Sequence, residues 1–288
     1  MYEFILNPIA GKGRSLRVLD RITDFLKVRG VGYTVHFTKY AGHASELARE
    51  LSRAPADLVV IGGDGTVSEV LNGIECFENV ALGIIPCGTG NDFAESARLP
   101  ADPKDAMEVV LSGESKFTDF IKLGEKRCMN VAGIGIDVDV LERYNRKKHR
   151  TKFTYMKCLI SALIALKWMN FDLEVDGKNL GRREAMITSV ANGKYFGGGM
   201  MISPASVIDD GKLDLVIVNK IPKRKMPGPL LGFKKGTLLK YDFVESIPCK
   251  KVRILSDAKK LVNVDGELFA SPVFECEIVS DALKMYRP

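Results

Sequence analysis

Three glycine-rich loops carry the residues best suited to chemistry. They are NPIAGKG at residues 7–13, GGDGT at 62–66 and PCGTGND at 86–92. Glycine lets main chain approach a ligand closely, and the N–H groups of a loop that opens onto a helix can bind phosphate. Asp64 is unexpected in such a loop, because a carboxylate repels an anion. A magnesium ion would remove the conflict, since it bridges carboxylates to phosphates. The pattern therefore indicates a site for a metal–nucleotide complex.

Each loop has a plainer interpretation when it is taken alone. A glycine turn before a helix is often only a tight turn, and Asp64 could be a simple helix N-cap. Three such loops at one edge of a sheet favour the phosphate interpretation. The chain has no G-x-x-x-x-G-K-[ST] motif and no G-x-G-x-x-G motif after its first strand. A P-loop enzyme and a common dinucleotide-binding site are therefore excluded.

A second candidate group lies in VNVDGEL, at residues 262–268. If this segment is one strand, Asp265 and Glu267 face the same side, since side chains repeat every second residue. Two carboxylates in one cleft repel each other, so one pKa should rise, and that carboxylate could accept a proton from a hydroxyl. The alternative is a hairpin turn with Asp at its corner. EVDGK at 174–178 has a similar turn, and we assign it no chemistry.

Strand and helix patterns alternate over roughly the first 115 residues. The strand-like segments are YEFIL, YTVHF, DLVVI and ALGII, and helical patterns occupy residues 14–29, 43–53, 66–74 and a segment near Asp92. Strands separated by helices predict a parallel sheet with helices on both faces. The carboxyl ends of such strands share one edge, where ligands bind. The three glycine loops should therefore face one crevice.

The pattern changes after FTDFIKL, at residues 117–123. Strand-like segments separated mainly by turns follow: EAMITSVAN, KLDLVIVN, KKVRILS, LVNVDGEL and FECEIVS. They predict an antiparallel, sandwich-like second domain, interrupted by a helix at about 154–169 and by a proline-rich basic stretch at 220–236. The predicted division is 1–118 for the α/β domain, 119–280 for the β-sandwich and 281–288 for a C-terminal segment that could return to the first domain.

Composition narrows the classes of protein. The 288 residues carry a formal net charge of +6, which is compatible with anionic lipid or nucleotide, and no nucleic-acid-binding motif is present. Three histidines and no G-x-S-x-G motif argue against acyl-transfer chemistry. The six cysteines form no C-x-x-C pair and suggest reduced thiols in a cytoplasmic protein. The longest apolar run, 158–169, is too short to span a bilayer, and no signal pattern precedes the first strand.

The segment 143–169 could meet a membrane. It joins a run of cations to an apolar helical segment with Phe153, Tyr155 and Trp168, which suit a lipid interface. The alternative is a solvated charge run followed by a helix packed on the sandwich. We expect peripheral contact with an anionic membrane surface at the inner membrane face. An exposed apolar edge could also support a homodimer.

The motifs and their order resemble the diacylglycerol kinase family, in particular its soluble bacterial lipid-kinase branch. NPIAG, GGDGTVSEVLNG and PCGTGNDFA look like the catalytic motifs, and the match continues through NVAGIGID, GGGMMISPASVIDDGKLDL and NVDGE over almost the whole chain. GGDGT is shared with sphingosine kinases, NAD kinases and phosphofructokinases, whereas GTGND and DDGKLD are more specific. The resemblance implies an N-terminal Rossmann-like three-layer α/β domain, then a β-sandwich domain, with a catalytic cleft between them.

The resemblance also implies ATP and Mg²⁺ as cofactors and specific residues for each role. Asp64 and Asp92 would position Mg²⁺, Glu267 would be the base with Asp265 beside it, and Asp119 would give supporting hydrogen bonds. A structural metal would be held by Asp209, the Lys212 carbonyl and Asp214, although these residues also suit a turn before a strand. The implied nucleotide-binding residues are Asn7, Pro8, Ile9, Ala10, Gly11, Thr38, Gly62, Gly63, Asp64, Gly65, Thr66, Val67, Ser68, Glu69, Thr89 and Asp92.

The expected reaction is ATP-dependent phosphorylation of the hydroxyl of diacylglycerol, a membrane lipid substrate, to phosphatidic acid. A polyprenol, a sphingoid base or monoacylglycerol would present a similar hydroxyl, so the acceptor stays open. A soluble NAD-kinase-like enzyme would share GGDGT but not GTGND and DDGKLD. A non-catalytic nucleotide- or lipid-binding regulator is disfavoured by the intact carboxylates of GGDGT and VDGE.

Overall fold

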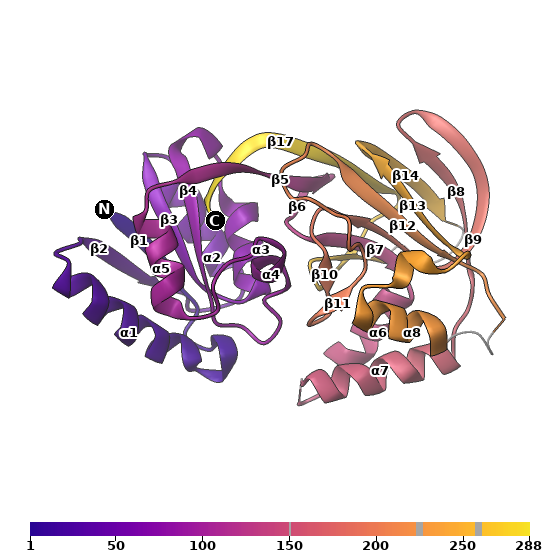
Figure 1. The fold of residues 1–288 in the computed structure, drawn as a ribbon, viewed down its shortest axis with the longest axis horizontal. Coiled ribbons are helices and arrows are strands. Elements are labelled where there is room, and N and C mark those ends of the chain that lie inside the picture. The colour runs from indigo at the N-terminus through magenta and orange to yellow at the C-terminus, as the bar shows by residue number, and fades with distance from the viewer. Residues whose placement is uncertain (150, 223–226, 257–260) are drawn as a thin grey trace. The chain divides into compact units, whose positions relative to one another are not determined.

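The computed structural model describes residues 1–149, 151–222, 227–256 and 261–288, which form two compact units (Figure 1). Unit 1 contains Met1–Phe120 and Val279–Pro288, and unit 2 contains Ile121–Ile278. The sequence places the corresponding boundaries after residues 118 and 280. The C-terminal segment 281–288 lies in unit 1.

Unit 1 is built on a parallel sheet. Its strands lie in the order β2 (Tyr33–Phe37), β1 (Tyr2–Leu6), β3 (Ala56–Gly62) and β4 (Val80–Pro86). The end of β17 (Phe274–Tyr286) adds a fifth parallel neighbour, since Lys284 and Met285 pair with β4. The Tyr286 hydroxyl then donates a 2.6 Å hydrogen bond to Asp57 Oδ1 at the start of β3.

Helices cover both faces of this sheet. α1 (Arg14–Val28) and α5 (Pro103–Leu111) share one apolar cluster with alternate residues of β1 and β3, such as Phe4 and Val59. The intervening residues, such as Ile5 and Val60, are also fully buried, so the other face is covered as well. Contacts of α2 (His43–Leu51) and α3 (Asp64–Gly73) with β1 and β3 account for that face. Short elements complete the unit: η1 (Ala10–Lys12), η2 (Phe77–Asn79) and α4 (Asp92–Ser96).

Unit 2 is mainly antiparallel. β9 (Lys178–Ala191) is its central strand and pairs with β7 (Val131–Gly135), β8 (Met169–Val175) and β12 (Leu213–Asn219). The remaining strands are β6 (Lys126–Cys128), β10 (Tyr195–Phe196), β11 (Met200–Met201), β13 (Val244–Cys249), β14 (Lys251–Ser256), β15 (Leu261–Val264), β16 (Glu267–Ala270) and the first part of β17; β5 (Ser115–Leu123) crosses the unit boundary.

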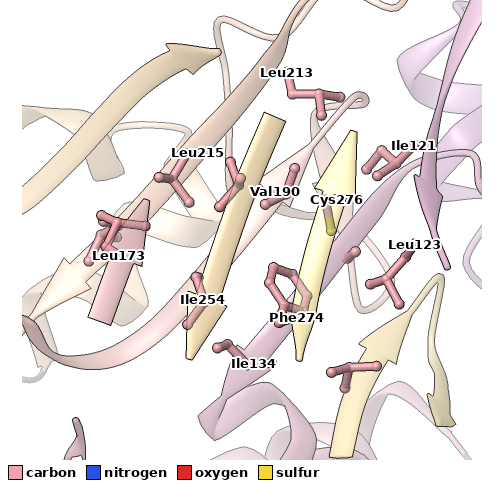
Figure 2. Close-up of a cluster of buried hydrophobic side chains, with 14 of the residues drawn as sticks. Ile121, Leu123, Ile134, Leu173, Val190, Leu213, Leu215, Ile254, Phe274 and Cys276 are labelled. Atoms are coloured by element: carbon pink, nitrogen blue, oxygen red, sulfur yellow. The ribbon is translucent and has the colours of Figure 1, made fainter. Parts of the chain in front are cut away.

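Side chains from many of these strands meet in one core. Leu173, Val190, Leu215, Ile254 and Phe274 point toward one another from β8, β9, β12, β14 and β17 (Figure 2). A second cluster lies where β9 and β12 pack against α6 (Ile136–Asn145), α7 (Lys152–Ile164) and α8 (Pro227–Lys235). The predicted fold class, an α/β domain followed by a β-sandwich-like domain, is confirmed.

Two details of unit 2 differ from the sequence expectation. The helix expected at about 154–169 ends at Ile164, and Met169 already begins β8. The basic stretch 220–236 contains α8, which starts at Pro227, a residue tolerated in a first helical turn because its missing N–H would have no partner there. Residues 223–226 of that stretch lie outside the described residues. No helix in the described ranges is both long and apolar enough to cross a bilayer.

Candidate functional site

The three glycine loops meet at the carboxyl edge of the unit 1 sheet, as predicted. In the parallel register Leu6 lies beside Ile61, and Gly62 beside Pro86, so β1, β3 and β4 end together. The Cys87 N–H donates to the Gly62 carbonyl at 2.9 Å and extends this pairing by one residue. The candidate nucleotide loops are therefore neighbours in space.

Glycine is required where the second and third loops touch. A Cβ on Gly63 would lie 2.8 Å from the Gly88 Cα, and a Cβ on Gly88 would lie 2.5 Å from the Gly63 Cα. Gly11 of the first loop has φ +58, and its Cβ would approach the Cys87 carbonyl oxygen to 2.1 Å. At these three positions glycine is needed because the backbones of neighbouring loops approach each other closely.

Gly65 is different, because no other atom of the described residues lies within 4 Å of the position of its Cβ, apart from its chain neighbours and the backbone of its own helix. It is exposed in the first turn of α3, where N–H groups and the helix dipole attract an anion. Open space beside a helix N-terminus is what a phosphate group requires. Gly65 is therefore the glycine best placed for a ligand.

Asp64 joins two of the loops. Its Oδ2 accepts a 2.7 Å hydrogen bond from the Asn91 N–H, and its Oδ1 accepts one at 3.2 Å from the Phe93 N–H. The carboxylate thus satisfies main-chain donors at the start of α4. Burial raises the pKa of Asp64, while these hydrogen bonds oppose the rise. Asp64 is not the N-cap of its own helix, since Gly63 holds that position.

Asp64 also lies near Asp92, the second carboxylate that the resemblance assigns to Mg²⁺. A point beside Gly90, where its Cβ would lie, is 2.8 Å from Asp64 Oδ2 and 3.7 Å from Asp92 Oδ2. The two carboxylates therefore flank one small region, and oxygen donors suit Mg²⁺. In the described ranges no cluster of three or more His, Cys, Asp or Glu side chains could hold a metal. A cation here would need further oxygens from phosphate or water.

The first loop is tied to the others by two side chains. Asn7 Nδ2 donates to Thr66 Oγ1 at 3.3 Å, and Asn7 Oδ1 accepts from the Ile9 N–H at 3.1 Å. Arg14 Nη2 donates to the carbonyls of Cys87 and Gly88 at 3.2 and 2.7 Å. The sequence analysis did not single out Arg14, although its place at the start of a helix after a glycine loop was a usable signal.

The other predicted nucleotide residues have varied surroundings. Ile9 and Thr89 are exposed, while Pro8, Ala10 and Thr38 are partly buried near the same edge. Val67 and Ser68 are buried. The Glu69 carboxylate accepts a hydrogen bond from the Ala44 N–H at 3.2 Å, at the start of α2. Val67, Ser68 and Glu69 are therefore in positions that stabilise the GGDGT loop through packing and hydrogen bonding.

Asp265 and Glu267 do not lie in one strand, so that premise is wrong. Asp265 and Gly266 form a two-residue hairpin loop with positive φ, 48° and 88°, between β15 and β16. The Asp265 carboxylate turns inward and accepts hydrogen bonds from the backbone N–H groups of Met129, Asn130 and Val131, at 2.6, 2.9 and 3.1 Å. Burial raises its pKa. Asp265 therefore anchors the hairpin.

The hairpin at Asp176 shows the same design. Asp176 and Gly177 have φ of 48° and 77°, and Asp176 Oδ1 accepts hydrogen bonds from the N–H groups of Lys250 and Lys251 at 2.9 and 2.8 Å. This corner carried no chemical assignment, and its likeness to Asp265 favours a structural role for both. Glu267, the exposed first residue of β16, remains the candidate base. Asp119 is buried in the part of β5 that belongs to unit 1.

Unit 2 contains a buried carboxylate that the sequence analysis did not assign. Asp137, in the first turn of α6, is 3% exposed, and its Oδ2 accepts a 3.0 Å hydrogen bond from Asn263 Nδ2. Its Oδ1 has no hydrogen-bond partner within the described part of the chain. Burial raises the pKa of Asp137 to about 6. NVAGIGID was noted as a motif, and its final Asp was the available signal.

Asp137 lines a narrow apolar cavity within unit 2. Among the lining residues that the structure describes, Tyr155 is the only other one with a polar side chain, and the wall comes from α6, α7, α8, β9, β10 and β11. An apolar cavity wall with one carboxyl that can form hydrogen bonds is typical of a site for an amphiphilic molecule. The described lining residues are Ile136, Asp137, Val140, Tyr155, Leu159, Leu163, Met186, Ile187, Phe196, Met200 and Phe233.

Two of the predicted structural-metal residues, Asp209 and Lys212, lie in the turn before β12, and the third, Asp214, is the second residue of β12. Asp214 Oδ2 accepts a 2.6 Å hydrogen bond from Ser206 Oγ, and the Lys212 N–H donates to Asp210 Oδ1 at 3.0 Å. Asp209 is exposed. Two carboxylates and a carbonyl are oxygen donors that suit Mg²⁺, so the donor chemistry fits while the residues also make an ordinary turn.

Two family models of known proteins match the N-terminal and the C-terminal part of the chain. Residues 2–123 match the family model described as the diacylglycerol kinase catalytic domain, and residues 130–287 match the YegS C-terminal NAD kinase beta sandwich-like domain. Together these two models account for most of the chain. The second model covers more than half of the chain, so the chain belongs to the family of the YegS C-terminal NAD kinase beta sandwich-like domain, and its first part matches the diacylglycerol kinase catalytic domain. The resemblance seen in the motifs is confirmed, and the chain is an enzyme of the lipid-kinase type.

Individual relatives carry related names. A Staphylococcus aureus (strain MRSA252) protein with a provisional lipid-kinase name is 28% identical over 247 residues, which are 83% of this chain and 79% of the relative. A crystal structure of a diacylglycerol kinase from Bacillus anthracis str. Sterne is 26% identical, with a TM-score of 0.81 over 100% of this chain and 96% of that one. An Archaeoglobus fulgidus NAD kinase in complex with ATP shares the fold, at 15% identity and a TM-score of 0.54 over 100% and 94%.

Proposed function

We propose that this lipid-kinase family member transfers the γ-phosphate of ATP, as its Mg²⁺ complex, to the hydroxyl of diacylglycerol and so forms phosphatidic acid. The apolar cavity of unit 2, in which Asp137 is the only charged side chain among the described lining residues, supports the choice of a lipid acceptor. As described, this cavity has room for little more than a water molecule, so an acyl chain could enter only if lining side chains move. Inside it the chain would lose contact with water, whereas the polar NAD molecule would leave many groups without hydrogen bonds. Family membership and the diacylglycerol kinase among its structural neighbours support the same choice.

The nucleotide would bind through the glycine loops of unit 1. The N–H groups at the start of α3 and the open space beside Gly65 suit phosphate oxygens. Arg14 and Asn7 hold the loops in place before the ligand arrives, which lowers the entropic cost of binding. Mg²⁺, when bound, would neutralise phosphate charge, and Asp64 and Asp92 are the residues that would face it. The NAD kinase neighbour that was crystallised with ATP supports ATP as the donor.

The acceptor hydroxyl must lose a proton to become a nucleophile. We assign that step to Glu267, because Asp265 already accepts three main-chain hydrogen bonds. Asp137 would accept a hydrogen bond from the polar end of the lipid. Its narrow cavity would admit a chain as the flexible side chains of Met186 and Met200 shift.

Transfer of labelled phosphate from ATP tests the function. The purified protein is incubated with diacylglycerol in mixed micelles, with magnesium and with a chelator, and NAD and sphingosine serve as separate acceptors. We expect labelled phosphatidic acid only with magnesium present. Label in NAD, or preferential labelling of sphingosine, would contradict the proposed acceptor. Calorimetry that records equal ATP affinity with and without magnesium would contradict the metal role.

A matched pair of variants tests the base. Glu267→Gln should lower kcat roughly 100- to 10,000-fold, with little change in ATP affinity or unfolding temperature. Glu125→Gln alters an equally exposed carboxylate in the turn after β5 and should keep full activity. Near-normal turnover by Glu267→Gln at saturating substrate would show that another group accepts the proton.

A further inference from the structure

The side chain of Asn263 joins two parts of unit 2 that are far apart in the sequence. Its Oδ1 accepts a 2.9 Å hydrogen bond from the Gly266 N–H, and its Nδ2 donates a 3.0 Å hydrogen bond to Asp137 Oδ2. A main-chain N–H can only donate, so the oxygen of the amide must face Gly266 and the nitrogen must face Asp137. The orientation of the Asn263 amide is therefore fixed by its two partners.

One partner belongs to the hairpin that presents the candidate base. Gly266 is the second residue of the two-residue loop, with φ of 88°, and Glu267 follows it directly as the first residue of β16. The Asp265 carboxylate fixes the first half of this loop by accepting hydrogen bonds from the N–H groups of residues 129–131. Asn263 fixes the second half, and so it restrains the main chain from which Glu267 projects.

The other partner belongs to the apolar cavity of unit 2. Asp137 Oδ2 accepts the hydrogen bond from Asn263, whereas Asp137 Oδ1 has no hydrogen-bond partner among the residues that the structure describes. A carboxylate can accept hydrogen bonds at both of its oxygens. Asp137 can therefore hold Asn263 with one oxygen and the polar end of a lipid with the other.

The packing around Asn263 keeps this bridge in place. Asn263 is buried in β15, and its main chain pairs with Gly133 of β7 on one side and with Leu268 of β16 on the other. A Cβ on Gly133 would lie 2.5 Å from Asp137 Oδ2, so glycine leaves the space that the carboxyl occupies. Either hydrogen bond of the bridge is costly to break, because a buried group that loses its partner finds no water to replace it.

We propose that Asn263 is a positioning residue that couples a lipid acceptor at Asp137 to the orientation of Glu267. This inference rests on the proposed function, since the acceptor and the base are those of that reaction. A lipid that bonds to Asp137 Oδ1 would restrict the rotation of the carboxyl. Asn263 would pass this restraint to the Gly266 N–H, and Glu267 would be held in its reactive position when the acceptor is bound.

A purely structural role for Asn263 would have different consequences. A buried amide that bridges a helix and a hairpin stabilises any fold, and its loss lowers the free energy of unfolding whatever the protein catalyses. A positioning residue also changes the turnover and the lipid affinity of molecules that are fully folded. Both effects should be confined to the acceptor, because the bridge contains no residue of the nucleotide loops.

An exchange of the two side chains separates these roles. Asn263→Asp keeps an acceptor for the Gly266 N–H but places a carboxylate against Asp137, so the bridge is lost. Addition of Asp137→Asn rebuilds the bridge in the opposite direction, because the amide introduced at position 137 can donate to the carboxylate introduced at position 263. The two side chains have nearly the same shape, and the oxygen of the new amide would still face the cavity.

Kinetics with diacylglycerol and ATP measure the result. Asn263→Asp should lower kcat about 100-fold and raise the KM for the lipid about tenfold, while the KM for ATP stays unchanged. The double variant should recover most of both losses. The control is Asn219→Asp, because Asn219 Nδ2 donates to Glu245 Oε1 at 2.6 Å between β12 and β13. It loses the same kind of hydrogen bond in the same unit and should keep both kinetic constants.

Amide hydrogen exchange measures the bridge without catalysis. In Asp137→Ala the far end of the bridge is removed, so the Gly266 N–H should exchange about three- to tenfold faster in nuclear magnetic resonance spectra. The N–H of Gly177, in the matching hairpin at Asp176, should exchange as in the wild type. Unfolding temperatures establish that each variant is folded.

The outcomes distinguish the bridge from the reaction. Unchanged exchange at Gly266 in Asp137→Ala would overturn the bridge itself. Wild-type kcat and lipid KM in Asn263→Asp, or no recovery in a double variant that is as stable as the wild type, would overturn the positioning role. A wild-type protein that phosphorylates no lipid would refute the proposed function, and the coupling to an acceptor with it, even where the exchange result stands.

Discussion

Replacement of Asp137 by Asn should stabilise the protein in a pH-dependent way. Burial is the main cause that raises the pKa of this carboxyl to about 6, and the hydrogen bond from Asn263 opposes it. An unfolded aspartate has a pKa of about 3.9, so the difference corresponds to about 3 kcal/mol between the two protonation states. The folded state therefore holds the proton more tightly than the unfolded state.

The sign of the effect follows from this difference. The stabilising contribution of Asp137 is complete below about pH 4 and is lost as the pH rises through 6. Asn cannot ionise, while its side-chain oxygen can still accept the hydrogen bond from Asn263. Asp137→Asn should thus change the free energy of unfolding little near pH 4 and raise it by up to about 3 kcal/mol near pH 8.

Urea unfolding at several pH values measures this effect. Asp105→Asn is the control, because Asp105 also lies in the first turn of a helix but is exposed. Its difference from the wild type should vary far less with pH. A constant difference between Asp137→Asn and the wild type from about pH 4 to about pH 8 would refute the reasoning, since it would mean that the buried carboxyl keeps an ordinary pKa.

Three further predictions concern the loops and turns. Gly88→Ala should destabilise the protein by about 1–3 kcal/mol, as measured by denaturation, because its Cβ would collide with the Gly63 backbone. Gly65→Ala should keep the unfolding free energy of the wild type but bind ATP more weakly in calorimetry. Equal ATP affinity of Gly65→Ala and the wild type would contradict a phosphate at that position. Asp265→Asn and Asp176→Asn should each lower the free energy of unfolding by roughly 1–3 kcal/mol, since each carboxylate accepts main-chain hydrogen bonds. If Asp265→Asn instead loses activity at an unchanged unfolding temperature, Asp265 has a catalytic role. Asp209→Ala with Asp214→Ala should lower both the unfolding temperature and the activity, and calorimetric magnesium titration of the folded protein should lose one binding event; if none of these changes, no metal is bound there.

Most of the first unit could be predicted because its patterns are local. Tyr2–Leu6 and Tyr33–Phe37 form strands as expected, and the parallel register brings the three glycine loops to one edge. The contacts that make this edge rigid were beyond prediction. Asp64 and Asn91 are far apart in sequence, and nothing in either motif indicates that one carboxylate would satisfy the N–H groups of the other loop.

The second unit shows where local reasoning fails. Alternation of side chains predicted that Asp265 and Glu267 share a side, and this is wrong. The alternative, a hairpin turn with Asp at its corner, is confirmed, because Asp-Gly favours the positive φ that such a turn needs. The outer face of α7 could not be separated from its core face by composition, because both are apolar. Asp137 was not assigned, since only the folded chain surrounds it with an apolar cavity and Asn263.

The return of the chain to the first sheet has a consequence for biosynthesis. Lys284 and Met285 complete that sheet beside β4, Tyr286 bonds to Asp57, and Arg287 bonds to Thr118 Oγ1 at 3.0 Å. Unit 1 is thus formed by residues 1–120 together with 279–288, and it cannot finish folding until the ribosome has translated its last strand. A deletion at residues 284–287 would therefore damage unit 1, whereas unit 2 is translated in full before these residues are made.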